Sequence, residues 1–443
     1  MTTQYCNLKG LRAMAGFLLL AFCAPLACAP LAWPQEAGTT DKARRADKPK
    51  DNAAVAEEIR LLREELRQAL AQQDARLAQM AEALRGLQSK PAEPPPAPKP
   101  PADTPPPAPA PPAAAKVSGT VTVCNSGCDF QDLQKAVDAA PSGGTVSVAA
   151  EVNGTCAVIN KPLRLLGQRD ANGGRPHFAG GICWGKAPFV TMAPNILIDG
   201  FEISGVKTGD GNGACIRIDP GTRDLVIRNV YCHDSQMAVL GGDAGRLLIE
   251  DSVFERTAPN ASYSHLLYLS DGNEAVIRRC KLLSATNLGH TLKSGYKRLL
   301  VEDSVIAALN GHNSRAIDAY GGGDIVLRGN VIQQGAESDN NDIIAIALEP
   351  KRLVPTGHAL LMERNWVLFD DAKRWHKVLI RGQHLGPLVV RDNVFVGLTG
   401  IGEDGVTQDG NRWFDSRENA GLPKFDGSLN TLPEPGRAAP APN

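Results

Sequence analysis

The chain has 443 residues, of which 43% are hydrophobic and 21% are charged, and its formal net charge is −1. A chain of this length can bury a large core. Its near-neutral charge gives no electrostatic basis for binding nucleic acid or an anionic membrane, so neither is an expected partner.

Residues 1–32 have the features of an export signal. Lys9 and Arg12 precede the apolar residues 13–32, and two prolines interrupt that stretch. A basic start followed by an apolar run is typical of a signal peptide, whereas prolines disfavour a stable membrane span. Lipid attachment at Cys28 and an uncleaved anchor are the alternatives. We expect a periplasmic or cell-envelope location, or secretion.

Two extended segments follow the export signal. Over residues 53–88 the hydrophobic residues advance by three or four, which predicts a coiled coil of about five heptads with one stutter. The chain is therefore an expected homo-oligomer, and a lone solvated helix is the alternative. Residues 91–116 form a Pro-rich linker, with 13 prolines among residues 91–112. Such a segment adopts extended polyproline II and acts as a spacer, and an SH3-type ligand role is the alternative.

Residues 129–140 read as a short amphipathic helix. Asp129 is a suitable N-cap, Pro141 ends the helix, and one face carries three apolar side chains, Phe130, Leu133 and Val137. We expect this helix to cover the open end of the fold that follows, because an uncovered sheet edge invites aggregation.

A motif then recurs eight times: a short β-branched run, a polar corner, and one or two further apolar residues. Residues 298–306, Arg-Leu-Leu-Val-Glu-Asp-Ser-Val-Ile, are one copy. The fourth residues of the copies are spaced by 29, 22, 28, 24, 26, 35 and 28 positions, at Ile198, Ile227, Ile249, Ile277, Val301, Leu327, Met362 and Val390.

A repeat of this period predicts a solenoid. A further short strand precedes each copy, so each period of roughly 25 residues holds three strands, which suits an all-β, single-stranded right-handed parallel β-helix. The predicted β-helix spans residues 117–426, and residues 427–443 are a predicted disordered tail. A β-sandwich is the alternative, although a sandwich does not repeat an internal motif eight times.

Seven cysteines lie beyond the export signal, and in an oxidising compartment they predict disulfides. Cys124 and Cys128 form a local pair, for which metal binding is the alternative. One coil of spacing separates Cys156 from Cys183, so stacking would bring them together. The remaining pair is Cys215–Cys232, which leaves Cys280 unpaired.

Polar side chains replace apolar ones at matching positions of three consecutive coils. Counted back from the fourth residue of the next copy, His265, His290 and Arg315 share one column, and Tyr268, Lys293 and Asp318 share a second. Given about 4.8 Å per coil, the six side chains should converge within roughly 10 Å. His312 lies nearby in sequence. A polar ladder that only solvates a groove is the alternative, and His233-Asp234 and Trp375-His376 are interpreted as ordinary loop residues.

The predicted fold resembles the pectate-lyase superfamily, whose entry segment resembles the cover helix and residues 141–148. The pair Lys293-Ser294, with Arg315 on the next coil, is similar to a pattern of the chondroitinase B and alginate lyase group. This resemblance implies that Lys293 removes the proton α to a uronate carboxylate and that Arg315 assists the leaving oxygen. The acidic residues that hold Ca²⁺ in that group are not evident here. We therefore expect no cofactor, with calcium as an alternative.

These observations predict an exported protein that acts on an acidic, uronate-containing polysaccharide by lyase-type β-elimination or C5 epimerisation. Lys293, Arg315 and His290 are the catalytic candidates, and substrate would be bound by His265, Tyr268, Asp318 and His312. A non-catalytic glycan-binding or envelope scaffold and a solenoid that docks a partner protein are the alternatives. Open access of Lys293 and Arg315 to a groove would favour catalysis, and salt bridges would favour the scaffold.

Overall fold

The structure is a computed structural model that describes residues 119–242, 244–257, 263–354, 357–371 and 374–437. The predicted export signal (1–32), coiled coil (53–88) and Pro-rich linker (91–116) lie outside these residues. Within them, no helix has the length and hydrophobicity needed to span a bilayer.

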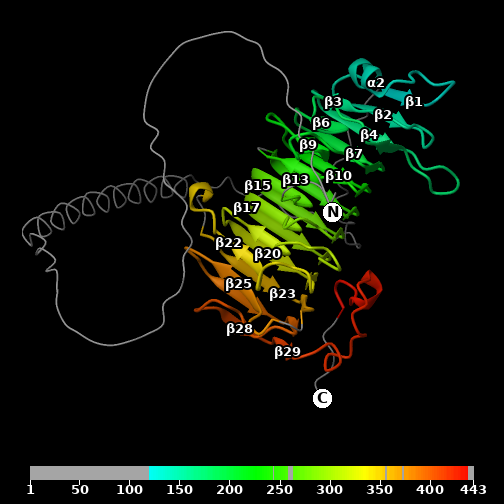
Figure 1. Cartoon of the computed structure of the whole chain (residues 1–443). Helices are drawn as coiled ribbons and strands as arrows, with labels where there is room; N and C mark the ends of the chain where they lie inside the picture. Colours follow the sequence, from blue (N-terminus) through cyan, green and yellow to red (C-terminus); the bar gives the residue numbers. More distant parts are fainter. Residues whose placement is uncertain (1–118, 243, 258–262, 355–356, 372–373, 438–443) are drawn as a thin grey trace, which may run out of the picture. The chain divides into compact units, whose positions relative to one another are not determined.

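The described chain winds into a parallel β-helix, as predicted (Figure 1). What we call the repeat face holds β1 (Thr120–Val123), β2 (Gly144–Val148), β4 (Leu163–Gly167), β7 (Ile196–Asp199), β10 (Leu225–Arg228), β13 (Ala244–Glu250), β20 (Asp324–Arg328), β23 (Leu360–Glu363), β26 (Leu388–Arg391) and β28 (Thr407–Asp409).

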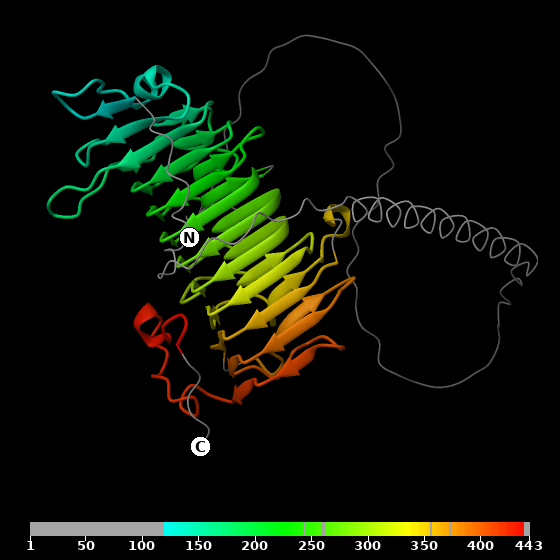
Figure 2. The ribbon, with the colours of Figure 1, turned by 180° about the vertical axis from the view of Figure 1, so that it is seen from behind.

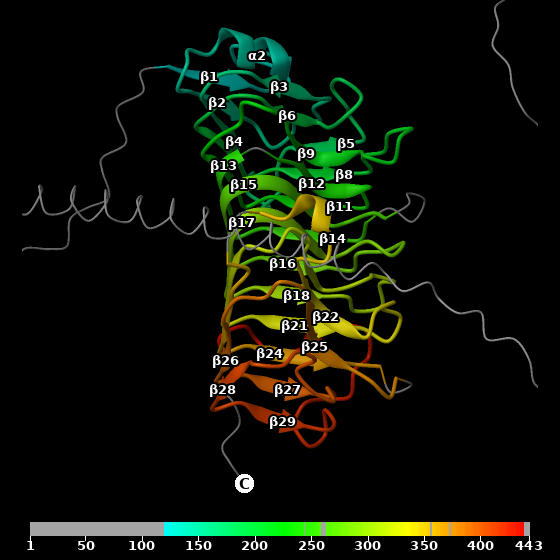
Figure 3. The ribbon, with the colours of Figure 1, turned by 90° about the vertical axis from the view of Figure 1, so that its left-hand side faces the viewer.

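The ten-stranded face is a separate sheet, whose strands are stacked in order in Figure 3. It consists of β5 (His177–Ala179), β8 (Glu202–Ser204), β11 (Tyr231–His233), β14 (Val253–Glu255), β16 (Lys281–Leu283), β18 (Val305–Ala307), β21 (Val331–Gln334), β24 (Trp366–Phe369), β27 (Val394–Val396) and β29 (Arg412–Phe414).

The third face carries the predicted site. Two long strands, β15 (Leu267–Arg278) and β17 (Leu292–Glu302), run from this face through the corner into the repeat face and join the two into one sheet. Its other strands are β3 (Ala157–Ile159), β6 (Phe189–Thr191), β9 (Ala214–Ile218), β12 (Met237–Gly241), β19 (Ile317–Ala319), β22 (Asp342–Ile346) and β25 (Val378–Gly382).

Strand register confirms the repeat residue by residue. Ile227 pairs with Ile198 on one side and with Ile249 on the other, and the same column continues through every copy to Met362 and Val390. All eight side chains are buried in one core. The sequence period is thus the physical coil, and each coil buries its apolar side chains against its neighbours.

The polar corners between the repeat face and the ten-stranded face contain a ladder of amide side chains. Asn365 Nδ2 donates to Asn393 Oδ1 at 2.9 Å, and the same contact joins Asn330 to Asn365 and Asn393 to Asn411 at 3.0 Å. Asn330, Asn365 and Asn393 are fully buried. Stacked amides therefore satisfy buried polar groups that would otherwise cost free energy at these four corners.

A short helix covers the N-terminal end of the coils, but it begins later than predicted. Helix α2 (Leu133–Ala139) is capped by Asp132, whose side chain accepts from the Lys135 backbone N–H at 2.8 Å. The predicted N-cap, Asp129, instead accepts from the Thr122 backbone N–H at 2.9 Å. Asp129 is unavailable as a cap because its carboxylate closes the turn after β1.

The C-terminal segment differs from the prediction of a disordered tail from residue 427. Leu432 is buried in a cluster with side chains of the ten-stranded face, and the Trp366 indole N–H donates to the Arg437 carbonyl at 3.0 Å. Figure 2 shows this segment turning back along the coils. The prediction is wrong for residues 427–437, because Leu429 and Leu432 pack in one cluster with apolar side chains of the ten-stranded face, such as Leu283. Residues 438–443 lie outside the described residues.

All three predicted disulfides are present: Cys124–Cys128, Cys156–Cys183 and Cys215–Cys232. Cys280 is a buried free thiol, as expected.

Candidate functional site

The register of the third face confirms both predicted columns. Tyr268 pairs with Lys293, and Lys293 pairs with Asp318. Leu267, Leu292 and Ile317 pair in the same way, which places His265, His290 and Arg315 in one column. His265 lies 12 residues before Ile277, whereas His290 lies 11 before Val301, and a register irregularity between Leu269 and Gly272 accounts for this difference.

The two histidines of the cluster stack in parallel. Their ring centroids lie 5.1 Å apart with planes at 1°, and the His290 backbone N–H donates to His265 Nδ1 at 2.9 Å. Burial above all, followed by the positive charges of His290 and Lys293, lowers the pKa of His265 to about 3. His265 is therefore neutral at physiological pH and serves as a hydrogen-bond acceptor for its neighbour.

Asp318 binds the second histidine from the next coil. Its Oδ2 lies 3.0 Å from His290 Nε2, and its side chain is buried. Burial alone would raise the pKa of Asp318, but the hydrogen bond from His290 and the charges of His290, Lys293 and Arg315 together lower it. His290 Nδ1 is buried without a hydrogen-bond partner among the described residues.

Lys293, the predicted base, is held between two carboxylates. Its Nζ lies 2.7 Å from Glu349 Oε1 and 3.8 Å from Asp318 Oδ2, and it sits over the rings of Tyr268 and Tyr320. The side chain is only 11% exposed. A general base must offer a free lone pair to substrate. In this arrangement the amine faces carboxylates and aromatic rings instead.

Arg315, the predicted assistant to the leaving oxygen, is also engaged. Its guanidinium forms an ion pair with buried Asp342 and donates to Asn340 Oδ1 at 2.9 Å. The Arg315 side chain is 12% exposed, and its charge is compensated by Asp342 within the protein. His312, in contrast, is exposed on the loop before β19, and the described residues give its side chain no contact with the cluster.

Sequence reasoning missed two members of this site that come from one loop. Glu349 precedes a single 3-10 turn, η1 (Pro350–Arg352), and Arg352 Nη1 donates to the Tyr268 hydroxyl at 2.7 Å. Both residues belong to the interval of 35 residues between Leu327 and Met362. That long interval was the available signal, because it marks an insertion in one coil that folds over the preceding coils.

A groove of about 660 Å³ opens beside the cluster. Its walls carry tyrosine rings and basic side chains, with one acidic residue, Asp271, and the lining includes Tyr268, Lys297, Tyr320, Lys351 and Arg352. Lys293 and Arg315 do not line it. The groove thus presents mainly basic side chains and a tyrosine ring to a ligand. The charges of Lys293 and Arg315, by contrast, are compensated by buried or nearby carboxylates.

Comparisons with known proteins identify no family for this chain. No family model and no curated protein matched its sequence. Among solved structures, a pectin methylesterase from carrot is similar over 61% of this chain and 85% of its own, with 11% identity and a TM-score of 0.34. A pectin methylesterase from Aspergillus niger covers 67% and 86% at 12% identity and a TM-score of 0.32. Likeness at this level carries no argument about activity.

Proposed function

We propose that this is an exported β-helix protein that binds an acidic, uronate-containing polysaccharide in the groove beside Tyr268, without using Lys293 as a base. The observation that carries the proposal is the division of charge on the third face. Lys297, Lys351 and Arg352 line the groove, whereas Lys293 and Arg315 are ion-paired beneath it. The parallel β-helix agrees with the fold that the sequence resemblance to the pectate-lyase superfamily implies, and the proposal makes no use of a lyase mechanism.

The groove suits an anionic glycan in two respects. Guanidinium and ammonium groups pair with carboxylates, and the half-buried Tyr268 offers an apolar ring for contact with a sugar. Export is supported by the three disulfides, which persist in oxidising compartments. The predicted oligomer through residues 53–88, outside the described residues, would add avidity along a repetitive polymer.

A second candidate function is β-elimination or C5 epimerisation with Tyr268 as the base. The Tyr268 hydroxyl accepts from Arg352 Nη1 at 2.7 Å, and Tyr268 lines the groove in which substrate would bind. Acting as the base, the Tyr268 oxygen would take the C5 proton. In elimination, the electron pair left on C5 would form the C4–C5 double bond as the C4–O bond breaks, and the leaving oxygen would take a proton from the Tyr268 hydroxyl or from water. In epimerisation, C5 would instead take a proton from water on the opposite face of the sugar.

One experiment separates the two functions. The full chain is tested against alginate, pectate and glycosaminoglycan oligomers for binding by calorimetry and for the ultraviolet absorbance of unsaturated product. Lys351→Glu with Arg352→Glu should weaken binding at least tenfold, because two attractive charges become repulsive. Lys207→Ala, which removes an exposed charge elsewhere, is the control and should leave affinity unchanged.

Tyr268→Phe then decides between binding and catalysis. Loss of product with retained binding would establish the tyrosine mechanism, and absence of product from the unmodified chain would leave binding alone. Equal affinity in the charge-reversed variant and the control would contradict the proposed groove.

A further inference from the structure

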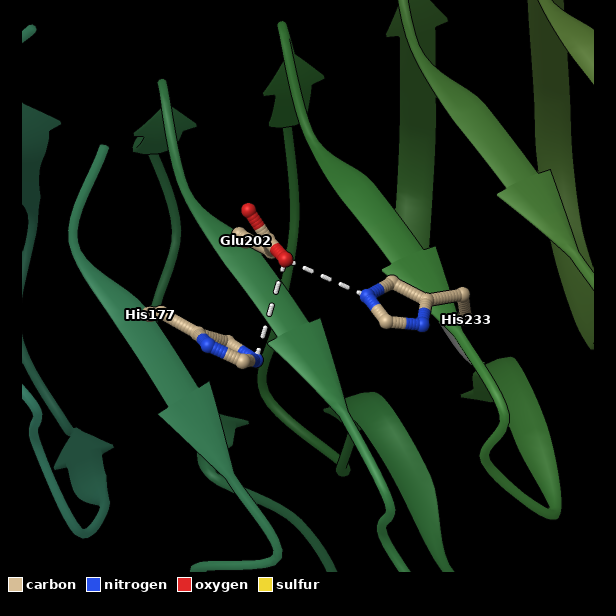
Figure 4. A group of neighbouring side chains, drawn as sticks. All are labelled: His177, Glu202 and His233. Carbon is tan, nitrogen blue, oxygen red and sulfur yellow. Dashed lines mark hydrogen bonds and ion pairs between the residues drawn. The ribbon is translucent and has the colours of Figure 1, made fainter. Parts of the chain in front are cut away.

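Two histidines and a glutamate converge at the start of the ten-stranded face, away from the groove. His177 begins β5, Glu202 begins β8 and His233 ends β11, so the three side chains come from three successive coils (Figure 4). The interpretation of His233-Asp234 as loop residues was wrong for His233, which lies in a strand. Among the described residues, this is the only group of three or more potential metal ligands whose atoms lie close together.

The strand register explains why they meet. His177 pairs with Glu202, and Glu202 pairs with Tyr231, two residues before His233. Because side chains alternate along a strand, positions that differ by two lie on the same side of the sheet. All three side chains are therefore on one side of this sheet.

The ligand atoms are close to metal-binding geometry. His233 Nε2 lies 3.3 Å and His177 Nε2 lies 3.9 Å from Glu202 Oε1, and the three atoms are all within 4.8 Å of one another. A tetrahedral zinc site with bonds of about 2.0–2.2 Å separates its ligand atoms by roughly 3.3–3.5 Å. A shift of one imidazole by little more than 1 Å would close the site, by this estimate.

Asp234 holds the His233 ring in the orientation that a metal ligand requires. His233 Nδ1 lies 2.6 Å from Asp234 Oδ2, and Arg256 donates to the same carboxylate at 3.0 and 3.1 Å. Hydrogen bonds from Arg256 foremost keep the pKa of Asp234 below its ordinary value, against the effect of burial. A carboxylate on one ring nitrogen directs the lone pair of the other toward the metal, as in many zinc sites.

The group is accessible, and among the described residues no lysine or arginine lies within ion-pair distance of its carboxylate, on which the charge of Arg175 acts from farther away. The side chains of His177, Glu202 and His233 are 36%, 30% and 16% exposed. Within the described part of the chain, the ion pairs of Glu202 are with the two histidines only. His177 Nε2 also lies 2.8 Å from Ser204 Oγ, so a metal bound at this nitrogen would replace that hydrogen bond.

We propose that His177, Glu202 and His233 bind a divalent transition metal, zinc foremost, with Asp234 as a positioning residue. Two imidazoles and one carboxylate suit Zn²⁺ or Co²⁺, whereas Ca²⁺ and Mg²⁺ prefer oxygen ligands alone. Three protein ligands at an exposed position leave a fourth site for water or an exogenous anion. The ion would also link three coils at the N-terminal end of this face.

The test is titration with Co²⁺ of the full chain, without a polyhistidine tag and stripped by a chelator. We expect one Co²⁺ per chain, with visible absorption of a four- or five-coordinate site that Zn²⁺ abolishes and excess Ca²⁺ does not. Cys280 is buried and should contribute no thiolate band. Failure to observe a stoichiometric Co²⁺ band would overturn the proposal.

Variants assign the ligands. Glu202→Gln, which keeps the side-chain shape, should weaken binding at least tenfold, and His177→Ala with His233→Ala should abolish it. Asp234→Asn should weaken binding about 10- to 100-fold while the absorption band is retained. His376→Ala removes an exposed imidazole elsewhere and should bind as the unmodified chain does. Unchanged binding in Glu202→Gln or in the double variant contradicts the assignment, and circular dichroism of the metal-free variants verifies folding.

Discussion

Two histidine–carboxylate groups on different faces of the same β-helix have opposite surroundings. On the third face, His290 Nε2 lies 3.0 Å from Asp318, and both side chains are buried beside Lys293. On the ten-stranded face, His233 Nε2 lies 3.3 Å from Glu202, and both side chains are partly exposed. Both groups pair a histidine with a carboxylate. Asp318, however, also lies near Lys293, whereas Glu202 faces a second imidazole, that of His177.

The comparison shows that a polar cluster can bind an external ligand only if its charged groups are not already paired within the protein, whatever its residue types. Asp318 is held by interactions within the protein, so the third-face cluster mainly organises the coils beneath the groove. Glu202 retains a charge that an external cation can satisfy.

The largest expected effect is the loss of Asp318. Asp318→Ala leaves Lys293 and the His290 ring buried with one partner fewer, and breaking a buried ion pair costs about 3–5 kcal/mol. Urea unfolding should show this loss, whereas Glu202→Gln in metal-free protein should cost less than about 1 kcal/mol, as expected for partly exposed groups. Equal losses at the two positions would break the comparison.

The next effect is a pH dependence from His265. Its pKa is about 3 in the folded protein, compared with 6.5 for a free histidine side chain. The unfolded chain thus binds more protons between these values, so His265 contributes stability that is complete above pH 6.5 and falls as the pH is lowered toward 3. Thermal unfolding of His265→Gln should show a shallower pH dependence over this window. His376→Gln should leave the dependence unaltered.

Zinc should stabilise the protein by a smaller amount that depends on concentration. A ligand that binds only the folded state at 100 times its dissociation constant adds about 2.7 kcal/mol. The midpoint of thermal unfolding should therefore rise with Zn²⁺ in the unmodified chain and in Asp318→Asn. A similar rise in the His177→Ala, His233→Ala variant would place the ion elsewhere.

The smallest effect is expected at the groove. Arg352 is 53% exposed, and its contacts with Glu349 and the Tyr268 hydroxyl lie at the protein surface. Exposed ion pairs contribute about 1 kcal/mol or less, so Arg352→Ala should barely change the free energy of unfolding while it weakens glycan binding. A large loss of stability would mean that Arg352 supports the fold rather than the ligand.

The sequence predicted the coils well because one physical cause produced the repeat. Each coil must bury an apolar side chain at the same position, so Ile227, Ile249 and Ile277 recur at the spacing of the coils. Counting residues by the same spacing correctly predicted that Lys293 lies beside Tyr268 and Asp318. The spacing of the repeat could not predict which charged side chains pair. Glu349 contacts Lys293 from an inserted loop, and the position of a residue in such a loop does not follow from the register of the strands.

The metal-ligand group escaped prediction for a related reason. His177 precedes the first recognised copy of the motif, and β5, β8 and β11 are each three residues long. A strand of three residues gives too little alternation to assign the side of a sheet on which a side chain lies. Without that assignment, His177 and His233, 56 residues apart in sequence, showed no common column.

The returning C-terminal segment has a consequence for the order of folding. In most solenoids each coil contacts only its neighbours, so assembly can proceed from either end. Here Arg417 donates twice to Asp370 at 2.6 Å, and Leu432 shares an apolar cluster with Leu283, several coils earlier. Because the returning segment follows all the coils in the chain, coils that have already formed keep an uncovered apolar flank until this segment has also been made. A chain truncated after β29 should therefore be the form most vulnerable to aggregation and proteolysis.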